Sequence, residues 1–346
     1  MSNRLLLIGP NFHDFNKYIS SAFQKFGWNV LIKSYNGPIN PYSMFNMVRY
    51  KLSCRKATLK EKSRRTFSAQ IREVFQKSSP QLVFILNGDI LTPEVVQYMH
   101  QKATVLLWLY DSITRLSPCW NFLHYCDKVF CYEQNDIKII KERTCIEAIF
   151  LPQAVNPSAY FKMDNVEKKW DIVFAAEMWH SIKRKHLIQT VVSHFPNRKI
   201  RVWGVYKPWY KGLWKCITRE RRDIYTNRET TTEQLNRDYN NAIIVLNIHN
   251  EQQTNGANPK VYEIAATGSY QICDANPYIE SLFPNGEIGL YHNEKELIEQ
   301  INWALDPANE NERESKAKRA QNIVLSSHTF ENRISQVLDW CSKEEL

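Results

Sequence analysis

The alternation of short apolar runs with amphipathic stretches constrains the fold of this chain more than any other feature. Runs such as "RLLLIG", "LVFILN" and "ATVLLWLY" have the length of strands, and stretches with apolar residues at helical spacing separate them. Parallel strands are buried on both faces, so they are apolar throughout, and helical crossovers connect them. The sequence therefore predicts an α/β fold in which parallel sheets carry helices on both faces. The predicted strands lie at 4–9, 28–33, 82–87, 103–110, 127–132, 146–152, 171–176, 200–204, 242–248, 269–274 and 287–291.

One polar, turn-rich stretch divides this pattern. The stretch "QAVNPSAYFKMDNVEKK" at 153–169 shows no alternation, and we interpret it as a linker. A chain of 346 residues suits two domains. We predict two doubly wound Rossmann-like domains, at 1–153 and 170–325, and a C-terminal helix at 326–346 that packs back toward the N-terminal domain. Ligands of doubly wound sheets bind beyond the carboxyl ends of the strands, so two such domains would face a central cleft.

Cysteine spacing and the length of the apolar runs predict a cytoplasmic protein. None of the eight cysteines forms a C-x-x-C pair, so neither a zinc ribbon nor a redox motif is expected. The N-terminus has neither the long apolar core nor the cleavage site of a signal peptide. The longest apolar runs are far shorter than a membrane span. We therefore expect reduced thiols and a location in the cytoplasm.

The positive charge of the chain is concentrated in two basic patches, 49–77 and 205–222. The formal net charge is +9, and the first patch holds ten Lys and Arg against two Glu. A basic amphipathic helix at 59–75 could lie on an anionic membrane surface. The alternative is a solvated basic face whose apolar side lies in the core. Nucleic acid is not an expected partner, because no RNP, KH or zinc-finger pattern occurs.

The stretch "NGANPKVYEIAATGSYQICD" at 255–274 predicts an anion site. Asn258 suits the N-cap of a helix and Pro259 suits its first turn. Lys260 places a positive charge where the helix dipole already attracts anions. Glu263 lies one turn further on, where its carboxylate could accept two hydrogen bonds from a ribose diol. The alternative is that Glu263 is a partly exposed helix residue and Lys260 a solvated one.

The segments "VLNIHN", "NGANPKVYEIAATGSYQICD" and "FPNGEIGLY" resemble the C-terminal half of group 1 glycosyltransferases with the two-domain GT-B fold. The resemblance is closest to the spore-maturation (CgeB-like) branch. The ending "SSHTFENRISQVL" also resembles the closing segment of that family. The positions that match the family pattern are Leu246, Asn247, His249, Gly256, Asn258, Lys260, Tyr262, Glu263, Gly268, Asp274, His328, Thr329 and Arg333.

The resemblance implies that the second domain binds a nucleotide-sugar donor. It assigns the ribose to Glu263 and the diphosphate to basic side chains and the helix N-terminus. Two departures concern the donor site: Lys260 stands where the family usually has Arg, and Asn255 stands where the wider superfamily often has a second glutamate. No two aspartates are two positions apart, so we expect a metal-independent enzyme without a cofactor. The donor-binding residues expected on these grounds are Glu263, Lys260, Asn258, Gly256, Arg184, Lys185, His249 and Asn255.

Acceptor chemistry is expected in the first domain. The loop "GPNFHDF" follows the first strand, where His13 or Asp14 could act as a base on an acceptor hydroxyl. Asp111 follows a buried strand at its carboxyl end and matches an acidic position of the family. His13 could equally be solvated, and Asp111 could equally cap the following turn.

The function predicted from the sequence is the transfer of a sugar from a nucleotide-sugar donor to a glycan or lipid-linked acceptor. The family resemblance places this reaction in bacterial surface polysaccharide or glycolipid assembly, with possible attachment to the inner face of the membrane. Two alternatives remain open. A sugar-nucleotide epimerase of the same fold would convert the donor without an acceptor, and a non-catalytic relative would bind nucleotide or sugar without turnover.

Overall fold

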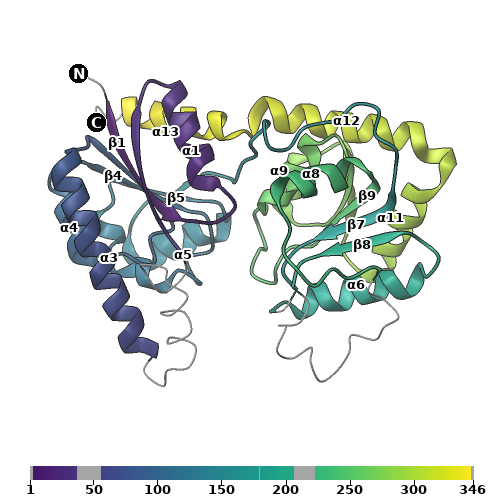
Figure 1. Cartoon of the computed structure of the whole chain (residues 1–346), viewed down its shortest axis with the longest axis horizontal. Coiled ribbons are helices and arrows are strands. Elements are labelled where there is room, and N and C mark those ends of the chain that lie inside the picture. The colour runs from purple at the N-terminus through teal and green to yellow at the C-terminus, as the bar shows by residue number, and fades with distance from the viewer. Residues whose placement is uncertain (1–2, 37–55, 179, 206–222, 344–346) are drawn as a thin grey trace. The chain divides into compact units, whose positions relative to one another are not determined.

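Two compact units make up the chain. Unit 1 consists of Met1–Pro152 and Phe330–Leu346, and unit 2 consists of Gln153–Thr329. Each unit holds its own sheet with helices around it (Figure 1). The structure, a computed structural model, describes residues 3–36, 56–178, 180–205 and 223–343.

Unit 1 contains a six-stranded parallel sheet with the strand order β2-β1-β3-β4-β5-β6. The strands are β1 (Arg4–Pro10), β2 (Asn29–Tyr35), β3 (Leu82–Leu86), β4 (Thr104–Leu109), β5 (Lys128–Cys131) and β6 (Ile149–Phe150). The helices are α1 (Phe15–Lys25), α3 (Lys56–Ser78), α4 (Pro93–His100), α5 (Gln134–Thr144) and α13 (Phe330–Lys343), with short 3₁₀ turns at Ser117–Asn121 and Leu123–Tyr125.

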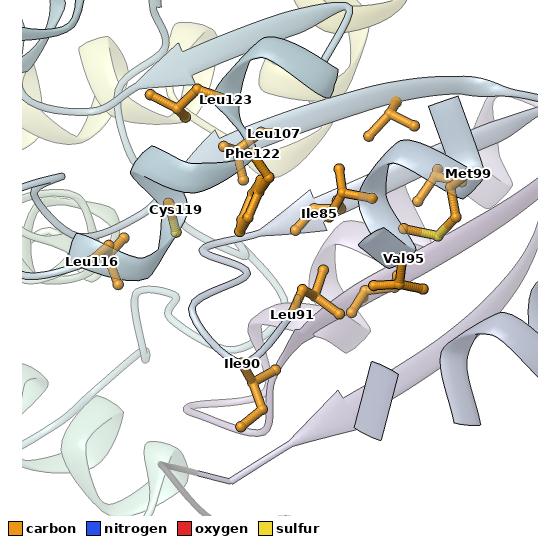
Figure 2. Close-up of a cluster of buried hydrophobic side chains, with 14 of the residues drawn as sticks. Ile85, Ile90, Leu91, Val95, Met99, Leu107, Leu116, Cys119, Phe122 and Leu123 are labelled. Carbon is orange, nitrogen blue, oxygen red and sulfur yellow. The ribbon is translucent and has the colours of Figure 1, made fainter. Parts of the chain in front are cut away.

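The core of unit 1 lies between the sheet and these helices. All five residues of β3 are buried, as expected for a central parallel strand. Figure 2 shows Val95 and Met99 of α4 in the same cluster as Ile85 of β3 and Phe122. These contacts hold the carboxyl ends of the strands in fixed positions, which matters because the predicted acceptor residues follow those ends.

Unit 2 contains a five-stranded parallel sheet with the strand order β11-β10-β9-β7-β8. The strands are β7 (Trp170–Ala175), β8 (Ile200–Trp203), β9 (Ala242–Asn247), β10 (Tyr270–Asp274) and β11 (Gly289–Tyr291). The helices are α6 (Ile182–His194), α8 (Thr232–Asn240), α9 (Pro259–Ala266), α10 (Pro277–Leu282), α11 (Glu294–Leu305) and α12 (Glu310–Ser327), with a 3₁₀ turn at Pro307–Asn309.

Helices cover both faces of the sheet in unit 2. Ile188 of α6 and Ile301 of α11 share one hydrophobic core with Ile172 and Ile272 of the sheet. Helices α8, α9 and α12 contact the sheet as well, and Figure 1 shows α8 and α9 on the side opposite α6. The predicted α/β fold with doubly covered parallel sheets is therefore confirmed, and each predicted apolar run forms a strand.

The segment 153–169 is not the free linker that we predicted. It belongs to unit 2, and Val155 and Tyr160 within it are buried. The side chains of Asn236 and Asn240 on α8 accept hydrogen bonds from its main chain, at 3.0 and 2.8 Å. Side chains of α8 therefore satisfy part of the main chain of this segment in place of regular structure.

The C-terminal helix α13 belongs to unit 1. It packs against α1, and the ring of Phe330 lies 6.2 Å from that of Phe15. The guanidinium Nε of the buried Arg333 donates a 2.7 Å hydrogen bond to the Pro152 carbonyl. The chain therefore returns to unit 1 between Thr329 and Phe330, four residues beyond the predicted boundary at 325/326.

The apolar side of α3 faces the core, so it is not available to a membrane. Phe67, Ile71 and Phe75 are all buried, while basic residues such as Arg65 and Lys77 form ion pairs with Glu on the exposed side. The structure therefore agrees with the alternative interpretation of 59–75, a basic face whose apolar side lies in the core. Attachment to a membrane through the basic face stays a prediction. The rest of the basic patches, 49–55 and 206–222, lies outside the described residues.

The described part of the chain contains no helix with the length and apolar character needed to cross a bilayer. Its cysteines are all free thiols, as predicted, and those buried deepest have pKa values raised by burial.

Candidate functional site

The direction of chain crossover in unit 2 locates the place where a ligand is expected. From β7 the chain passes to β8 on one side of the sheet and then returns to β9 on the other side. Such a reversal leaves a crevice beyond the carboxyl ends of the two central strands. In unit 2 the residues that follow these strands are 176–178 and 180–181 after β7, and 248–258 after β9.

Arg184 ties these two loops together. Its Nε donates to the Ile248 carbonyl at 2.8 Å, and its Nη1 donates to the Glu177 carbonyl at 3.1 Å. The side chain is buried. We predicted that Arg184 would neutralise a diphosphate, but these contacts make it a clamp on the main chain. Lys185, the other predicted basic residue, lies half-buried in the same helical turn.

A carboxylate already occupies the N-terminus of α6. Ser181 caps the helix, and its hydroxyl donates to Glu251 Oε1 at 3.1 Å, as does the N–H of Lys183. Partial burial would raise the pKa of Glu251, but hydrogen bonds from its own N–H, from Lys183 and from Ser181 lower it. The first turn of α6 is therefore used by an anion of the chain itself.

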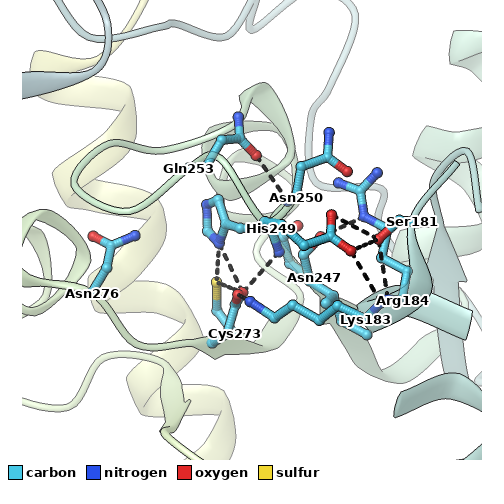
Figure 3. Close-up of polar contacts among 12 residues, drawn as sticks. Ser181, Lys183, Arg184, Asn247, His249, Asn250, Gln253, Cys273 and Asn276 are labelled. Carbon is cyan, nitrogen blue, oxygen red and sulfur yellow. Dashed lines mark hydrogen bonds and ion pairs between the residues drawn. The ribbon is translucent and has the colours of Figure 1, made fainter. Parts of the chain in front are cut away.

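Asp274 and His249 form a buried hydrogen-bonded pair at the ends of β10 and β9 (Figure 3). Asp274 Oδ1 accepts from His249 Nδ1 at 2.8 Å and from the His249 N–H at 2.9 Å. Lys183 Nζ donates to Asp274 Oδ2 at 2.6 Å. Burial alone would raise the pKa of Asp274, but His249 and Lys183 together hold it well below its usual range.

His249 does not face a ligand, contrary to our prediction. Its side chain is 0% exposed, and its second ring nitrogen, Nε2, accepts a 3.3 Å hydrogen bond from the N–H of Asn258. Both nitrogens are therefore committed to the protein. Lys183 and Asp274 were absent from the predicted site, although an aspartate at the end of a strand is a signal that could have pointed to the second.

Asn258 caps α9, as predicted. Its Oδ1 accepts from the N–H of Val261, and its side chain exchanges two hydrogen bonds with Asn247, at 2.9 and 3.2 Å. Gly268 has φ +70° and follows the last turn, so it ends the helix as expected. The predicted Gly256 is also buried, and its carbonyl accepts from Asn276 Nδ2 at 3.0 Å.

Glu263 is buried on α9 with an incomplete set of partners. It is 6% exposed, so the interpretation as a partly exposed helix residue is wrong. Burial raises its pKa, while Lys260 and a hydrogen bond from the Tyr160 hydroxyl lower it. Lys260 Nζ lies 3.9 Å from Oε2. Among the residues that the structure describes, Glu263 Oε2 has no hydrogen-bond partner.

Tyr160 could not have been predicted as a neighbour of Glu263. It lies more than a hundred positions earlier, in the segment interpreted as a linker, and no sequence signal connects the two. The half-buried Asn255, predicted to be a donor-binding residue, lies in the loop before α9.

Three buried side chains near this site carry atoms of the kind that bind metals. His249 Nδ1, Cys273 Sγ and an Asp274 oxygen lie within 4.8 Å of one another. Because Nε2 of His249 accepts the Asn258 N–H, the ring proton lies on Nδ1, and Nδ1 has no lone pair to offer a metal. The Lys183 ammonium on Asp274 further opposes a cation. The contacts of this group therefore favour a hydrogen-bonded network over a metal centre.

The corresponding crevice in unit 1 lies between the ends of β1 and β3, where the chain reverses direction across the sheet. His13 and Asp14 follow β1, and both adopt left-handed backbone conformations, with φ 47° and 57°. Asp14 pairs with Lys17 at 2.8 Å on the surface. Both residues thus follow the carboxyl end of β1, where the strand order reverses, in a strained loop of the kind often found at functional sites.

Asp111 caps its own turn in unit 1. Its Oδ1 accepts from the Ser112 N–H at 2.9 Å, and its Oδ2 pairs with Arg115 at 2.9 Å. Burial raises its pKa, against the lowering effect of Arg115. The capping role that we considered as the alternative is therefore present. The neighbouring Asn87 accepts from the N–H groups of Tyr110 and Asp111, which joins the ends of β3 and β4.

Comparison with known proteins identifies the class of the fold. Residues 183–339 match the family model described as glycosyl transferase-like. No curated protein matches the sequence. Sucrose-phosphate synthase from Thermosynechococcus elongatus has a similar structure, with a TM-score of 0.71, 14% identity, and coverage of 99% of this chain and 98% of that one.

Two further solved structures agree with this result. HepE from Anabaena, solved in complex with UDP and glucose, has a TM-score of 0.66 at 10% identity, over 99% of this chain and 100% of that one. The UDP-forming α,α-trehalose-phosphate synthase from Burkholderia vietnamiensis has a TM-score of 0.65 at 12% identity, over 98% and 100%. At these identities the likeness establishes the fold, which is of the GT-B type. The assignment to the CgeB-like branch stays a prediction. Residues 183–339 match a glycosyl transferase-like family model, within a chain whose fold is of the GT-B type.

Proposed function

We propose that the chain transfers a sugar from a nucleotide-sugar donor to a glycan or lipid-linked acceptor, and that unit 2 holds the nucleotide at the N-terminal half of α9. The observation that carries this proposal is the buried carboxylate of Glu263, whose Oε2 has no hydrogen-bond partner among the described residues. The structure of HepE with UDP and glucose supports the choice of donor class, because that protein has the same fold.

A buried carboxylate oxygen without a donor lowers stability, and a ligand that supplies O–H groups removes that penalty. The 2′ and 3′ hydroxyls of a ribose are two adjacent donors of this kind. Tyr160 already donates to the carboxylate and fixes its orientation. In our proposal Glu263 therefore accepts hydrogen bonds from the ribose of the donor.

The charge of Lys260 holds the diphosphate in this proposal. Lys260 lies in the first turn of α9, where the helix dipole adds to its positive charge. The N–H groups of Asn258 and Val261 are already used within the site, and Pro259 has none. The attraction therefore comes from the Lys260 ammonium and the dipole rather than from a set of free amides, with Lys185 as a second cation from α6.

The remaining parts of the proposal rest on the family resemblance. Asn255 contacts the sugar in place of a carboxylate, and transfer proceeds without a metal ion. Unit 1 binds the acceptor, with His13 or Asp111 as the base. The setting is bacterial surface polysaccharide or glycolipid assembly in the cytoplasm, with charge attraction to the inner membrane face through the basic patches 49–77 and 205–222.

A thermal-shift panel with UDP, GDP, dTDP, ADP and CMP, with and without EDTA, tests the proposal first. A ligand that binds only the folded state raises the melting temperature. We expect one nucleotide to give a selective shift that EDTA does not remove. A shift that EDTA abolishes would contradict metal-independent binding, and the absence of any shift would contradict the donor site.

Calorimetry on matched variants then tests the role of Glu263. Glu263→Gln should weaken binding of the selected nucleotide about tenfold or more, which corresponds to about 1.4 kcal/mol. Glu299→Gln is the control, because that residue is exposed on α11 of the same unit. Equal affinity of Glu263→Gln and the wild type would remove the ribose assignment. Product analysis with the donor alone separates transfer from epimerisation, because an epimerase converts the donor without an acceptor.

A further inference from the structure

We propose that His249 is a positioning residue of the donor site: its ring, held by Asp274 and Lys183, fixes the N–H of Asn258 and thereby the N-terminus of α9 against the nucleotide. This inference rests on the proposed function, because it explains how the α9 residues that meet the donor are held in place. It replaces the direct contact with the donor that the sequence predicted for His249.

The hydrogen bonds of the ring determine its tautomer. The N–H of Asn258 can only donate, so Nε2 of His249 must accept. Nδ1 then carries the ring proton and donates it to Asp274 Oδ1 at 2.8 Å. A ring with a proton on Nε2 would place two donors against each other. The surroundings of His249 therefore select the neutral form with its proton on Nδ1.

Lys183 and Asp274 maintain this arrangement. Asp274 remains ionised because Lys183 donates to Oδ2 at 2.6 Å while His249 donates to Oδ1. An ionised carboxylate is a strong acceptor for the Nδ1 proton. Lys183 lies in the first turn of α6 and Asp274 ends β10, so the network joins two elements that are far apart in the sequence (Figure 3).

Asn258 transmits this order to the proposed donor ligands. Its N–H is held by His249, and its side chain is held by Asn247 and by the N–H of Val261. Asn258 is also the N-cap of α9, an eight-residue helix that carries Lys260 and Glu263. A change in the position of this cap would move both proposed ligands, since they lie within its first two turns.

Two isosteric variants separate the two hydrogen bonds of the ring. In His249→Asn the side-chain amide takes the place of Nδ1, so it keeps the donor to Asp274 and loses the acceptor for Asn258. In His249→Gln the carbonyl oxygen takes the place of Nε2, so it keeps the acceptor for Asn258 and loses the donor to Asp274. His292→Asn and His292→Gln are matched controls, because His292 is exposed in the same unit and forms ion pairs with glutamates.

The experiment measures binding of the nucleotide selected by the panel, by calorimetry, and the ring tautomer, by ¹⁵N NMR. We expect His249→Asn to lower the nucleotide affinity about tenfold, because the loss of one hydrogen bond between neutral groups changes an equilibrium constant by about that factor. His249→Gln keeps this hydrogen bond and should bind with nearly the affinity of the wild type. The His292 variants should bind as the wild type does. The wild-type spectrum should show a neutral ring with its proton on Nδ1.

Three results would contradict the inference. Equal affinity of the wild type and both His249 variants would show that the ring does not position the site. A fall in melting temperature with unchanged affinity would show a purely structural role. A proton on Nε2 in the wild type would exclude the contact with Asn258. If the wild-type protein binds no nucleotide at all, the proposed function fails, and this inference fails with it.

Discussion

The two units present polar residues at the same place in their sheets but hold them in different ways. In unit 2 the Lys183–Asp274 pair has side-chain exposures of 36% and 11%, and its carboxylate is bonded to a fully buried histidine. In unit 1 the Lys17–Asp14 pair has exposures of 74% and 46%. The carboxylate of the unit 2 pair is thus buried among fixed partners, whereas the unit 1 pair that follows β1 lies on the surface.

This difference fits the proposed function, in which unit 2 binds the donor and unit 1 the acceptor. A nucleotide with fixed shape and charge is bound best by groups that are already in position, because little conformational entropy is then lost. The buried network of unit 2 meets that requirement. The exposed, locally bonded residues of unit 1 suit a surface whose specificity can vary with the acceptor. The predictions below test this comparison by altering one unit at a time.

The largest effect is expected from Asp274→Asn. Removing the charge leaves Lys183 without its partner. Because Asp274 is buried but Lys183 is 36% exposed, we expect a loss of about 3 kcal/mol in the free energy of unfolding, the lower end of the range for breaking a buried pair. The matched change in unit 1, Asp14→Asn, should cost less than about 1 kcal/mol, because the pair is exposed. Urea unfolding followed by hydrogen exchange measures the two losses, in β9 and β10 for Asp274→Asn and in β1 and β2 for Asp14→Asn. Similar losses for the two variants would remove the contrast between the units.

The pH dependence of this effect has a defined sign. The folded-state pKa of Asp274 is lowered, so its stabilising contribution is complete above the unfolded value of about 3.9 and is lost as pH falls through the folded value. The stability difference between the wild type and Asp274→Asn should therefore be constant near neutral pH and shrink in strong acid. A difference that grows on acidification would contradict the ion-pair assignment.

A smaller loss of stability is expected from Arg184→Met, which removes the hydrogen bonds that join the loops after β7 and β9. Two main-chain carbonyls lose a charged donor, so the free energy of unfolding should fall by about 1.5–3 kcal/mol. Arg237→Met is the control, because Arg237 pairs with Glu233 on the surface of α8 and should contribute less than about 0.5 kcal/mol. If Arg184→Met lowers the free energy of unfolding as little as Arg237→Met does, the hydrogen bonds of Arg184 are not needed for stability.

Glu263→Gln should separate stability from binding. Replacing the buried carboxylate removes a charge with an unpartnered oxygen, so we expect a gain of about 1 kcal/mol in stability at neutral pH together with weaker nucleotide binding. Because burial raises the folded pKa of Glu263, the wild type loses stability as pH rises from the unfolded pKa through the folded one. The advantage of the variant should therefore be largest at neutral pH and vanish in acid. A variant less stable than the wild type at pH 7 would contradict this account.

The smallest effects on stability and nucleotide binding are expected in unit 1. His13→Ala should change the free energy of unfolding by less than about 0.5 kcal/mol, since the residue lies in a surface loop. Asp111→Asn should leave nucleotide affinity unchanged. If either residue is the catalytic base, its loss should lower sugar transfer by about 10²–10⁴-fold. Weaker nucleotide binding in either variant would place these residues in the donor site instead.

The fold was largely predictable, because the signals that determine it are local. Apolar runs predict buried parallel strands, and Asn258, Pro259 and Gly268 mark the two ends of α9 through their own backbone preferences. The unit boundaries were less predictable. The polar stretch 153–169 is ordered by the amides of α8, and a sequence pattern does not reveal such distant partners.

The contacts of the site could be predicted only in part. The order of the strands places the ends of β9 and β10 next to each other, and this order brings His249 to Asp274. Nothing in the sequence specifies that these two strands are neighbours, or that Lys183 on α6 contacts Asp274. The orientation of Glu263 could not be predicted either. The residues from Val261 to Ala266 are all buried, so helical periodicity does not separate a buried face of α9 from an exposed one.

Hydrogen exchange with and without the nucleotide selected by the panel tests the central claim most directly. The account predicts new protection across residues 249–263, which contain the cap of α9 and the proposed ligands Lys260 and Glu263, and no change across residues 3–36 of unit 1. Protection confined to unit 1, or its absence from 249–263 when the nucleotide is bound, would contradict the assignment of the donor to unit 2.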